Sequence, residues 1–142
     1  MTPIEFWVSG EPKGQPRPKA FSRGGFTRVY DPGTAEGWKG CVALAARQYL
    51  PKEPLACPVS LRLSFKMPRP KGHYRANGTL KDSAPRCFSK KPDADNLAKA
   101  VMDALTQLRV WLDDCQVVRL DVHKTYAIKT PGVSIEIQEV TQ

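Results

Sequence analysis

Aspartates gather in one stretch of the sequence, where five of the eight in the chain fall between positions 93 and 114. Asp93 and Asp95 stand at the entrance of an expected helix, and Asp113 and Asp114 fall in an expected turn. Hard divalent cations such as Mg²⁺ bind through a few carboxylate oxygens and leave positions for phosphate oxygens and water. Such a metal supports phosphodiester hydrolysis because it activates water and stabilises the leaving oxygen. The alternatives are local: Asp93 could serve only as a helix cap, and the Asp113–Asp114 pair only as a turn.

Lys99 and Asp103 continue the pattern of charged residues at intervals of four residues from Asp95. On a helix these three side chains lie within a narrow arc, opposite the apolar stripe that begins at Leu97. Their spacing favours an exposed ladder of ion pairs, each worth roughly 0.2–0.5 kcal/mol. The alternative interpretation makes Lys99 a cation beside a scissile phosphate, where charge develops during the reaction.

Basic residues concentrate in two other segments, residues 12–30 and 68–92, which together carry a net charge of +11. The whole chain carries +8, so the remaining residues sum to −3. Segregation of this kind predicts a surface that binds a polyanion, most commonly nucleic acid. The alternative is a pair of solvated loops that only keep the chain soluble. The candidate DNA contacts are Lys13, Arg17, Lys19, Arg23, Arg28, Arg69, Lys71, Arg75, Lys90 and Lys91.

Aromatic residues lie in the basic segment 12–30 and next to the acidic pair at 113–114. Phe21, Phe26 and Tyr30 interleave with the basic residues of segment 12–30, where they either stack on bases or anchor the arm to the fold. Trp111 stands just before the acidic pair at 113–114. A core position is favoured for Trp111, and the alternative is a wedge near unpaired bases.

Hydrophobic periodicity predicts the elements that position these residues. The expected helices are residues 34–50 and 95–108. The expected strands are residues 4–8, 59–67, 117–127 and 133–138, with a hairpin-like turn at 130–132 between the last two. The two proline-rich basic segments are expected to be loops. The order β-α-β-α-β-β predicts an α/β (α+β) fold with one mixed sheet and two main helices packed on a face.

Length and composition restrict the class of protein further. A chain of 142 residues is typical of one domain, here expected to span residues 1–142. With 41% hydrophobic and 25% charged residues, the composition excludes collagen-like, mucin-like and fully disordered chains. The N-terminus lacks the pattern of a signal peptide, and no apolar stretch approaches the ~20 residues of a membrane span. The four scattered cysteines fit neither a disulfide framework nor a zinc site, which favours reduced thiols in a cytoplasmic protein.

Two linked motifs carry a more specific signal. The segments 92–105 and 110–118 contain D-x-D-N-L-x-K-x-x-x-D-A-L and W-x-D-D-x-Q-V. With its flanking strands, this region resembles the RusA family of Holliday-junction resolvases over residues 59–140. The resemblance implies a homodimeric endonuclease that depends on Mg²⁺, with Mn²⁺ as a substitute, and cuts four-way DNA junctions by paired nicks in recombination and repair.

The resemblance also implies roles for single residues. It assigns the metal to Asp93, Asp95 and Asp114, a catalytic function to Lys99, and supporting positions around the metal to Asn96, Asp103 and Asp113. The long 68–92 loop and the proline-rich arm depart from compact family members and are similar to those of phage- and prophage-borne members.

Three rival functions are compatible with parts of this pattern. A catalytically silent protein that binds junction or duplex DNA would share the basic segments. A metal-dependent nuclease for flaps or other branched substrates would share the acids as well. An RNA-binding protein of the ribosomal type explains the charge but leaves the acidic cluster without a purpose.

The position of Asp114 poses a geometric question. The helix that begins at Asp95 rises ~20 Å along its length. Asp114 follows its end after six residues, which could span about 20 Å when fully extended. Either residues 109–114 fold back along the helix and one chain builds the site, or Asp114 meets Asp93 and Asp95 of a partner subunit. We favour the first arrangement.

Overall fold

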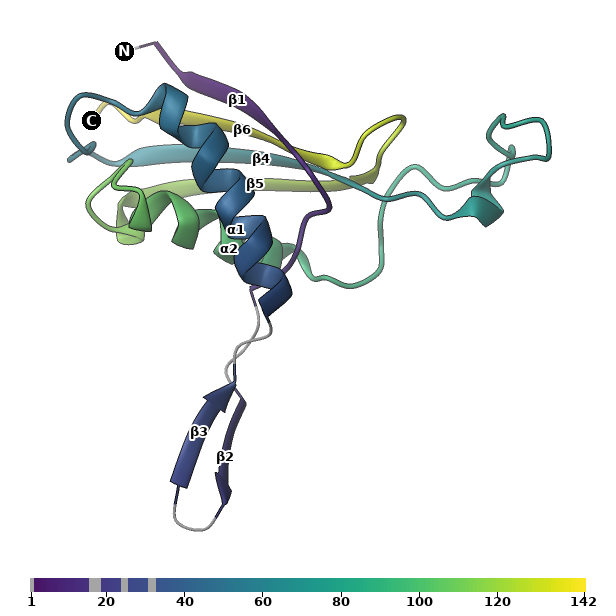
Figure 1. Ribbon diagram of the computed structural model, residues 1–142. Helices are drawn as coiled ribbons and strands as arrows, with labels where there is room; N and C mark the ends of the chain where they lie inside the picture. Colours follow the sequence, from purple (N-terminus) through teal and green to yellow (C-terminus); the bar gives the residue numbers. More distant parts are fainter. Residues whose placement is uncertain (1, 16–18, 24–25, 31–32) are drawn as a thin grey trace.

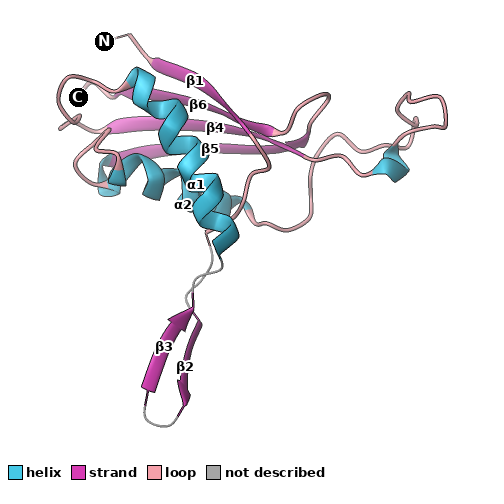
Figure 2. Cartoon of the chain, in the orientation of Figure 1, coloured by secondary structure: helices cyan, strands magenta, loops and turns pink. Residues whose placement is uncertain are grey.

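The computed structural model describes residues 2–15, 19–23, 26–30 and 33–142. A four-stranded mixed sheet forms its centre, in the order β1-β6-β4-β5 (Figure 1). The strands are β1 (Ile4–Ser9), β4 (Val59–Met67), β5 (Val117–Tyr126) and β6 (Gly132–Glu139). The helices α1 (Gly33–Ala46) and α2 (Ala94–Gln107) pack on the sheet (Figure 2). The predicted α+β fold with one mixed sheet and two main helices is confirmed.

The central strand β4 shows why one face of the sheet is covered. Its side chains alternate, so that every second residue from Val59 to Met67 is buried under the helices while those between face outward. Helix α2 contributes a matching stripe that includes Leu97, Val101 and Leu105, all buried. Burial of each large apolar side chain stabilises the fold by roughly 1.5–3 kcal/mol. The stripe fixes the rotation of α2 and therefore directs its polar side, which carries the candidate site, away from the core.

The connection between the last two strands differs from the prediction. The turn at residues 130–132 reverses the chain, but β5 and β6 do not pair with each other as a hairpin. Strand β4 lies between them, parallel to β5 and antiparallel to β6. Because the β4-α2-β5 crossover already occupies one edge of β4, β6 pairs with the other edge. The Thr-Pro-Gly turn predicted that the chain reverses after β5. It carries no information about which edge of β4 is free to pair with β6.

The arm at residues 12–30 also differs from the prediction of a loop. It contains β2 (Lys19–Arg23) and β3 (Phe26–Tyr30), which pair antiparallel as a separate two-stranded sheet. The sequence signal was present, since two runs with β-branched and aromatic residues flank a Gly-Gly dipeptide. The side chains of the predicted contacts Arg17, Lys19, Arg23 and Arg28, and of Phe21, Phe26 and Tyr30, lie outside the described residues.

Two further segments connect these elements. Helix α1 is followed by a 3-10 turn at Arg47–Tyr49, and the 68–92 segment is a loop with one 3-10 turn at Lys71–His73. The end of this loop runs beside β5, where the Phe88 N–H donates to the Lys124 carbonyl at 3.1 Å. Across the described part of the chain, neither helix has the length and apolarity to cross a membrane.

Candidate active site

The entrance of α2 carries the first two acids. Asp93 occupies the N-cap position with an extended backbone, and its carboxylate makes no capping hydrogen bond within the described chain. Asp95 Oδ1 accepts a hydrogen bond from the Asn96 backbone N–H at 2.9 Å. Asp93 is therefore the N-cap residue by position, but its carboxylate does not cap the helix through a hydrogen bond.

Two neighbouring segments hold this entrance in place. Lys124 Nζ, from β5, donates hydrogen bonds to the carbonyls of Lys90 at 2.9 Å and Pro92 at 2.8 Å. The Gln15 N–H donates to the Asn96 carbonyl at 2.9 Å. The basic N-terminal arm and the 68–92 loop therefore both meet the fold where α2 begins.

The chain reverses direction at the end of α2 through a Schellman motif. The Arg109 N–H donates to the Thr106 carbonyl at 3.0 Å, and the Val110 N–H donates to the Leu105 carbonyl at 3.1 Å. Arg109 has φ 69°, in the left-handed region, which costs a non-glycine residue ~1–2 kcal/mol. Burial of Val110, directly after the turn, offsets this cost and draws the chain back toward the core.

Trp111 completes the return. It is fully buried, and its Nε1–H donates to Thr106 Oγ1 at 2.7 Å. The Thr106 hydroxyl in turn donates to the Met102 carbonyl at 2.8 Å, so the indole is tied to the last turns of α2. The favoured interpretation of Trp111 as a core residue is confirmed, and the wedge interpretation is wrong.

The two acids after Trp111, Asp113 and Asp114, have different contacts. Asp113 caps the 3-10 turn η3 (Asp114–Gln116), because its Oδ1 accepts from the Cys115 N–H at 3.0 Å. The turn interpretation therefore holds for Asp113. The Asp114 carboxylate instead faces Lys99 of α2.

Gln116 fixes this turn, a role that the sequence analysis missed. Its Oε1 accepts from the backbone N–H groups of Leu112 at 2.8 Å and Asp113 at 2.9 Å. Its Nε2 donates to the carbonyls of Leu55 at 2.8 Å and Cys57 at 2.9 Å. The signal was the D-x-x-Q spacing of a capping box, which predicts the contact with the Asp113 N–H but not those with the distant carbonyls.

Asp114 lies beside α2 of its own chain. Lys99 Nζ is 3.9 Å from Asp114 Oδ2 and 3.3 Å from Asp103 Oδ1. The lysine therefore lies between two carboxylates, one from its own helix and one from the turn after it. Residues 109–114 fold back along the helix, as the first of the two predicted arrangements requires.

A buried lysine supports this cluster from the neighbouring helix. Lys39 of α1 is 7% exposed, and its Nζ lies 3.8 Å from Asp103 Oδ2 and 3.6 Å from Glu36 Oε1. Asp103 therefore forms an ion pair with Lys39 through one carboxylate oxygen and with Lys99 through the other. Nothing in the sequence pattern singled out Lys39, because its partner belongs to a helix more than fifty positions further along the chain.

Asp113 and Asp114 differ in acidity although they are neighbours. Burial, and then the hydrogen bond with Asp113, raises the pKa of Asp114, and the charge of Lys99 opposes this rise. The pKa of Asp113 is lowered, chiefly because its carboxylate accepts the Cys115 N–H. A cation near Asp114 would therefore favour the ionised form that burial disfavours.

The segment that holds this lysine–aspartate cluster is similar to known proteins. The family model described as endodeoxyribonuclease RusA matches residues 9–138, which include every acid of the site. The chain belongs to the RusA family. The uncharacterized protein YqaN of Bacillus subtilis (strain 168) is 38% identical over 144 residues, 99% of each chain. The crossover junction endodeoxyribonucleases RusA of Escherichia coli (strain K12) and Enterobacteria phage 82 are each 34% identical over 86 residues, 61% of this chain. The match spans 56% of the length of these two RusA nucleases.

The side chains of this RusA-family site are of the type that binds a hard cation, but they are not close enough together to bind one. The donors are carboxylate oxygens, and the buried Gln15 Oε1 near the start of α2 has no hydrogen-bond partner in the described chain. However, no three Asp, Glu, His or Cys side chains among the described residues come close enough together to hold one metal ion. Among the described residues, Asp93, Asp95 and Asp114 therefore do not form such a group, and Asp114 is paired with Lys99.

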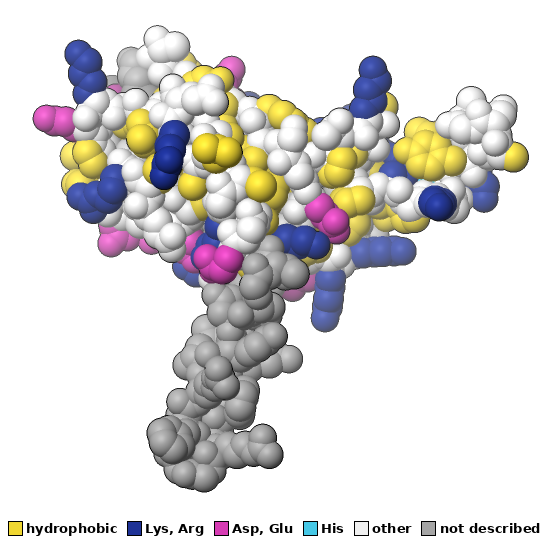
Figure 3. Space-filling model, in the orientation of Figure 1, with side chains coloured by type: hydrophobic (Ala, Val, Ile, Leu, Met, Phe, Trp, Pro, Cys, Tyr) yellow, Lys and Arg dark blue, Asp and Glu magenta, His cyan; other side chains and the backbone are white. Residues whose placement is uncertain are grey.

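The five basic residues of the 68–92 loop that were predicted to contact DNA differ in their own contacts. Arg69 and Arg75 hold the loop together: Arg69 Nη1 donates to the Pro85 carbonyl at 2.8 Å, and Arg75 Nη2 lies 2.9 Å from Asp82 Oδ1. Lys71, Lys90 and Lys91 are exposed and stay available for an anionic partner, in a region where several basic side chains stand out from the surface (Figure 3).

Two of the basic residues lie near the entrance of α2. Lys91 lines a hollow of about 330 Å³ together with Asp93 and Asn96. Lys13 precedes Gly14, which lies against Pro92 and Asn96, and its Nζ pairs with Glu11 at 3.3 Å. A cation that can meet a phosphate therefore lies next to the first acid of the site.

Proposed function

We propose that this RusA-family protein is a Mg²⁺-dependent endonuclease that resolves four-way DNA junctions by paired nicks, in DNA recombination and repair. The observation that carries the proposal is the position of Lys99 between Asp103 and Asp114 in one chain. Lys99 of the first family motif, on the helix that follows Asp93, thus lies beside Asp114 of the second motif, on the turn after that helix.

Each residue of the cluster has a distinct part in this proposal. Bound Mg²⁺, or Mn²⁺ in its place, supplies a Lewis acid for phosphodiester hydrolysis. Asp93, Asp95 and Asp114 would hold it, and Asp114 would then exchange its ion pair with Lys99 for the metal. The freed Lys99 ammonium neutralises charge that develops on the phosphate. Asp103 positions Lys99, and Asn96 and Asp113 hold the backbone around the ligands.

A substrate panel tests the proposal against its rivals. Labelled four-way junction, flap and duplex DNA are incubated with the protein, with Mg²⁺ and with a chelator. We expect nicking of the junction with Mg²⁺ only. Faster cleavage of the flap would support the rival branched-DNA nuclease, and binding without any nicking would support the silent binder.

Counterion release supplies a prediction about the basic residues. Replacing both Lys90 and Lys91 with glutamine should flatten the slope of log K against log salt by up to ~2 for junction binding, because each neutralised phosphate contact releases about one counterion. Binding is measured with a chelator present, so that no strand is cut. The matched control replaces Arg47 and Lys52, which are exposed outside the two basic segments, and should keep the wild-type slope. An unchanged slope in the Lys90/Lys91 variant would show that these lysines do not contact DNA.

We also propose that two copies associate through β5, because resolution by symmetric nicks needs two equivalent sites. Strand β5 is at the edge of the sheet. Residues 86–88 cover its end near Tyr126, and among the described residues no strand pairs with the outer edge of residues 117–123. Two apolar side chains on this stretch are exposed, Val118 at 61% and Leu120 at 46%.

The sequence of this edge is complementary to itself. The Lys124 carbonyl and the Tyr126 N–H bond to the covering segment, so by strand alternation the backbone groups of Leu120 also face outward. Antiparallel pairing centred on Leu120 places this residue opposite its own copy. The same register places Arg119 opposite Asp121 of the partner subunit, which pairs opposite charges twice across the two-fold axis.

The dimer gives a prediction for Leu120. We expect the wild-type protein to be a dimer at micromolar concentration and the Leu120→Arg variant to be a monomer, because two arginines would meet at the axis. Light scattering measures the mass. Leu44→Arg, on the exposed side of α1, should remain dimeric. A monomeric wild-type protein, with and without DNA, would contradict the dimer.

A further inference from the structure

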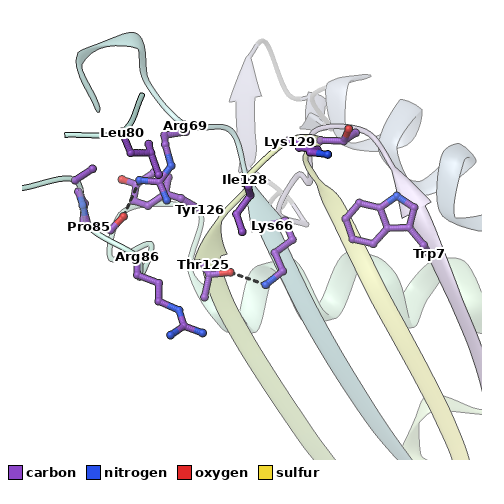
Figure 4. Close-up of a pocket in the computed structure, with 12 residues that line it drawn as sticks. Trp7, Lys66, Arg69, Leu80, Pro85, Arg86, Thr125, Tyr126, Ile128 and Lys129 are labelled. Carbon is purple, nitrogen blue, oxygen red and sulfur yellow. Dashed lines mark hydrogen bonds between the residues drawn. The ribbon is translucent and has the colours of Figure 1, made fainter. Parts of the chain in front are cut away.

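We propose that a basic hollow on the open face of the sheet binds an unpaired DNA strand, with one base stacked on Trp7; this rests on the proposed action on branched DNA. The hollow has a volume of about 890 Å³ (Figure 4). Lys66 and Thr125, which line it, are neighbours in register on the sheet face opposite Phe65 and the core. The hollow is therefore separate from the acidic cluster on α2.

The charge of the hollow points to an anionic ligand. Four of its lining residues are basic: Lys66, Arg69, Arg86 and Lys129. None of the lining residues that the structure describes is acidic. Four cations in one concave surface create a positive potential that attracts a phosphate backbone.

Two of these cations are held in position. Lys66 Nζ donates to Thr125 Oγ1 at 2.9 Å. The Arg69 guanidinium lies 4.9 Å from the centre of the Tyr126 ring, and its Nη1 donates to the Pro85 carbonyl (Figure 4). A charge that is already fixed loses little conformational freedom when a phosphate binds.

Trp7 adds a flat surface of the kind that bases stack on. It is 42% exposed, whereas Trp38 and Trp111 are buried. Its Nε1–H donates to Ser9 Oγ at 2.9 Å, and its ring lies so close to Gly132 that any side chain at that position would collide with it. The glycine and the serine therefore hold the indole in one orientation at the rim of the hollow.

The combination of fixed cations and an exposed indole favours a single strand over a duplex. A single strand offers both an anionic backbone and free base faces, and stacking on an aromatic side chain is worth ~1–3 kcal/mol per base. Bases in a duplex are stacked on each other and cannot reach Trp7. Exposed Ile128, on the lining of the hollow, extends the apolar surface available to a base or sugar.

The test uses the fluorescence of Trp7 and needs no cleavage. Because the other two tryptophans are buried, we expect oligo(dT), added with a chelator, to quench the exposed fraction of the emission. Trp7→Phe should bind oligo(dT) with nearly wild-type affinity, measured by anisotropy of a labelled strand, but lose the quenching. Trp7→Ala should weaken oligo(dT) binding roughly 5- to 100-fold and leave duplex binding unchanged.

A second variant keeps the test decisive if Trp7→Ala folds poorly. Replacing Arg86 and Lys129 with glutamine should also weaken oligo(dT) binding and flatten its salt dependence by up to ~2, whereas the Arg47/Lys52 control should not. Unchanged oligo(dT) affinity in both the Trp7→Ala and the Arg86/Lys129 variants, or quenching that survives Trp7→Phe, would overturn the proposal. Failure of junction cleavage would count against the proposed function alone, since these readouts measure only binding.

Discussion

The Asp95→Asn variant is expected to lose cleavage of a four-way junction and to bind the junction as tightly as the wild type, or more tightly. The substitution removes the charge of a proposed metal ligand without a change in size, and it reduces the repulsion toward phosphates. A catalytic metal ion supplies several kcal/mol of transition-state stabilisation in enzymes of this kind. We therefore expect the cleavage rate to fall by at least about 10³-fold, at roughly 1.4 kcal/mol per factor of ten.

Two measurements on this variant separate chemistry from binding. The single-turnover cleavage rate with Mg²⁺ reports the chemistry, and an electrophoretic shift of the junction with a chelator reports the affinity. Glu53→Gln, an exposed acid outside the site, is the matched control and should cleave at the wild-type rate. Cleavage by Asp95→Asn at the wild-type rate would show that Asp95 has no catalytic role.

Gln116→Ala should produce the largest loss of stability among substitutions in the motif. One amide makes four hydrogen bonds, two to N–H groups of the turn and two to the carbonyls of Leu55 and Cys57. At about 0.5–1.5 kcal/mol each, with part of the loss recovered by water, the free energy of unfolding should fall by roughly 2–4 kcal/mol. Cleavage should fall as well, because the turn that presents Asp114 is no longer fixed.

Chemical denaturation measures this effect directly. Gln107→Ala, an exposed position at the end of α2, should leave the free energy of unfolding nearly unchanged. Gln116→Glu keeps the acceptor for the two N–H groups but turns a carboxylate oxygen toward two carbonyl oxygens, so it should also destabilise the protein at neutral pH. A Gln116→Ala variant as stable as the wild type would show that the turn does not depend on this amide.

Strong periodicity made the helix and strand of the site predictable. The alternation along β4 and the stripe of α2 each bury one side, and burial of that side decides which residues remain on the polar side. Because the apolar stripe of α2 is buried, Asp95, Lys99 and Asp103 lie on the opposite, polar side of the helix. The turn with Asp113 also follows from local chemistry, since its capping contacts reach only two or three residues along the chain.

Contacts between distant parts of the chain were not predictable in this way. The pair of Lys39 with Asp103 depends on how α1 lies against α2, and the carbonyls that receive Gln116 Nε2 come from a segment about sixty residues earlier. The order of β5 and β6 around β4 depends on which edge remains open. The same holds for Asp114, whose return along α2 is possible on length alone but is set by the left-handed Arg109 and the burial of Trp111.

The most direct test of the central claim, resolution of a four-way junction by a metal-dependent site, is to map every nick in a junction whose four strands carry different labels. With Mg²⁺ we predict two nicks at symmetry-related positions in opposite strands, with ends that a ligase can seal, and no nicks when a chelator replaces the metal. No cleavage of the junction with Mg²⁺, equal cleavage with the chelator, or nicks spread without symmetry over all four strands would contradict the account.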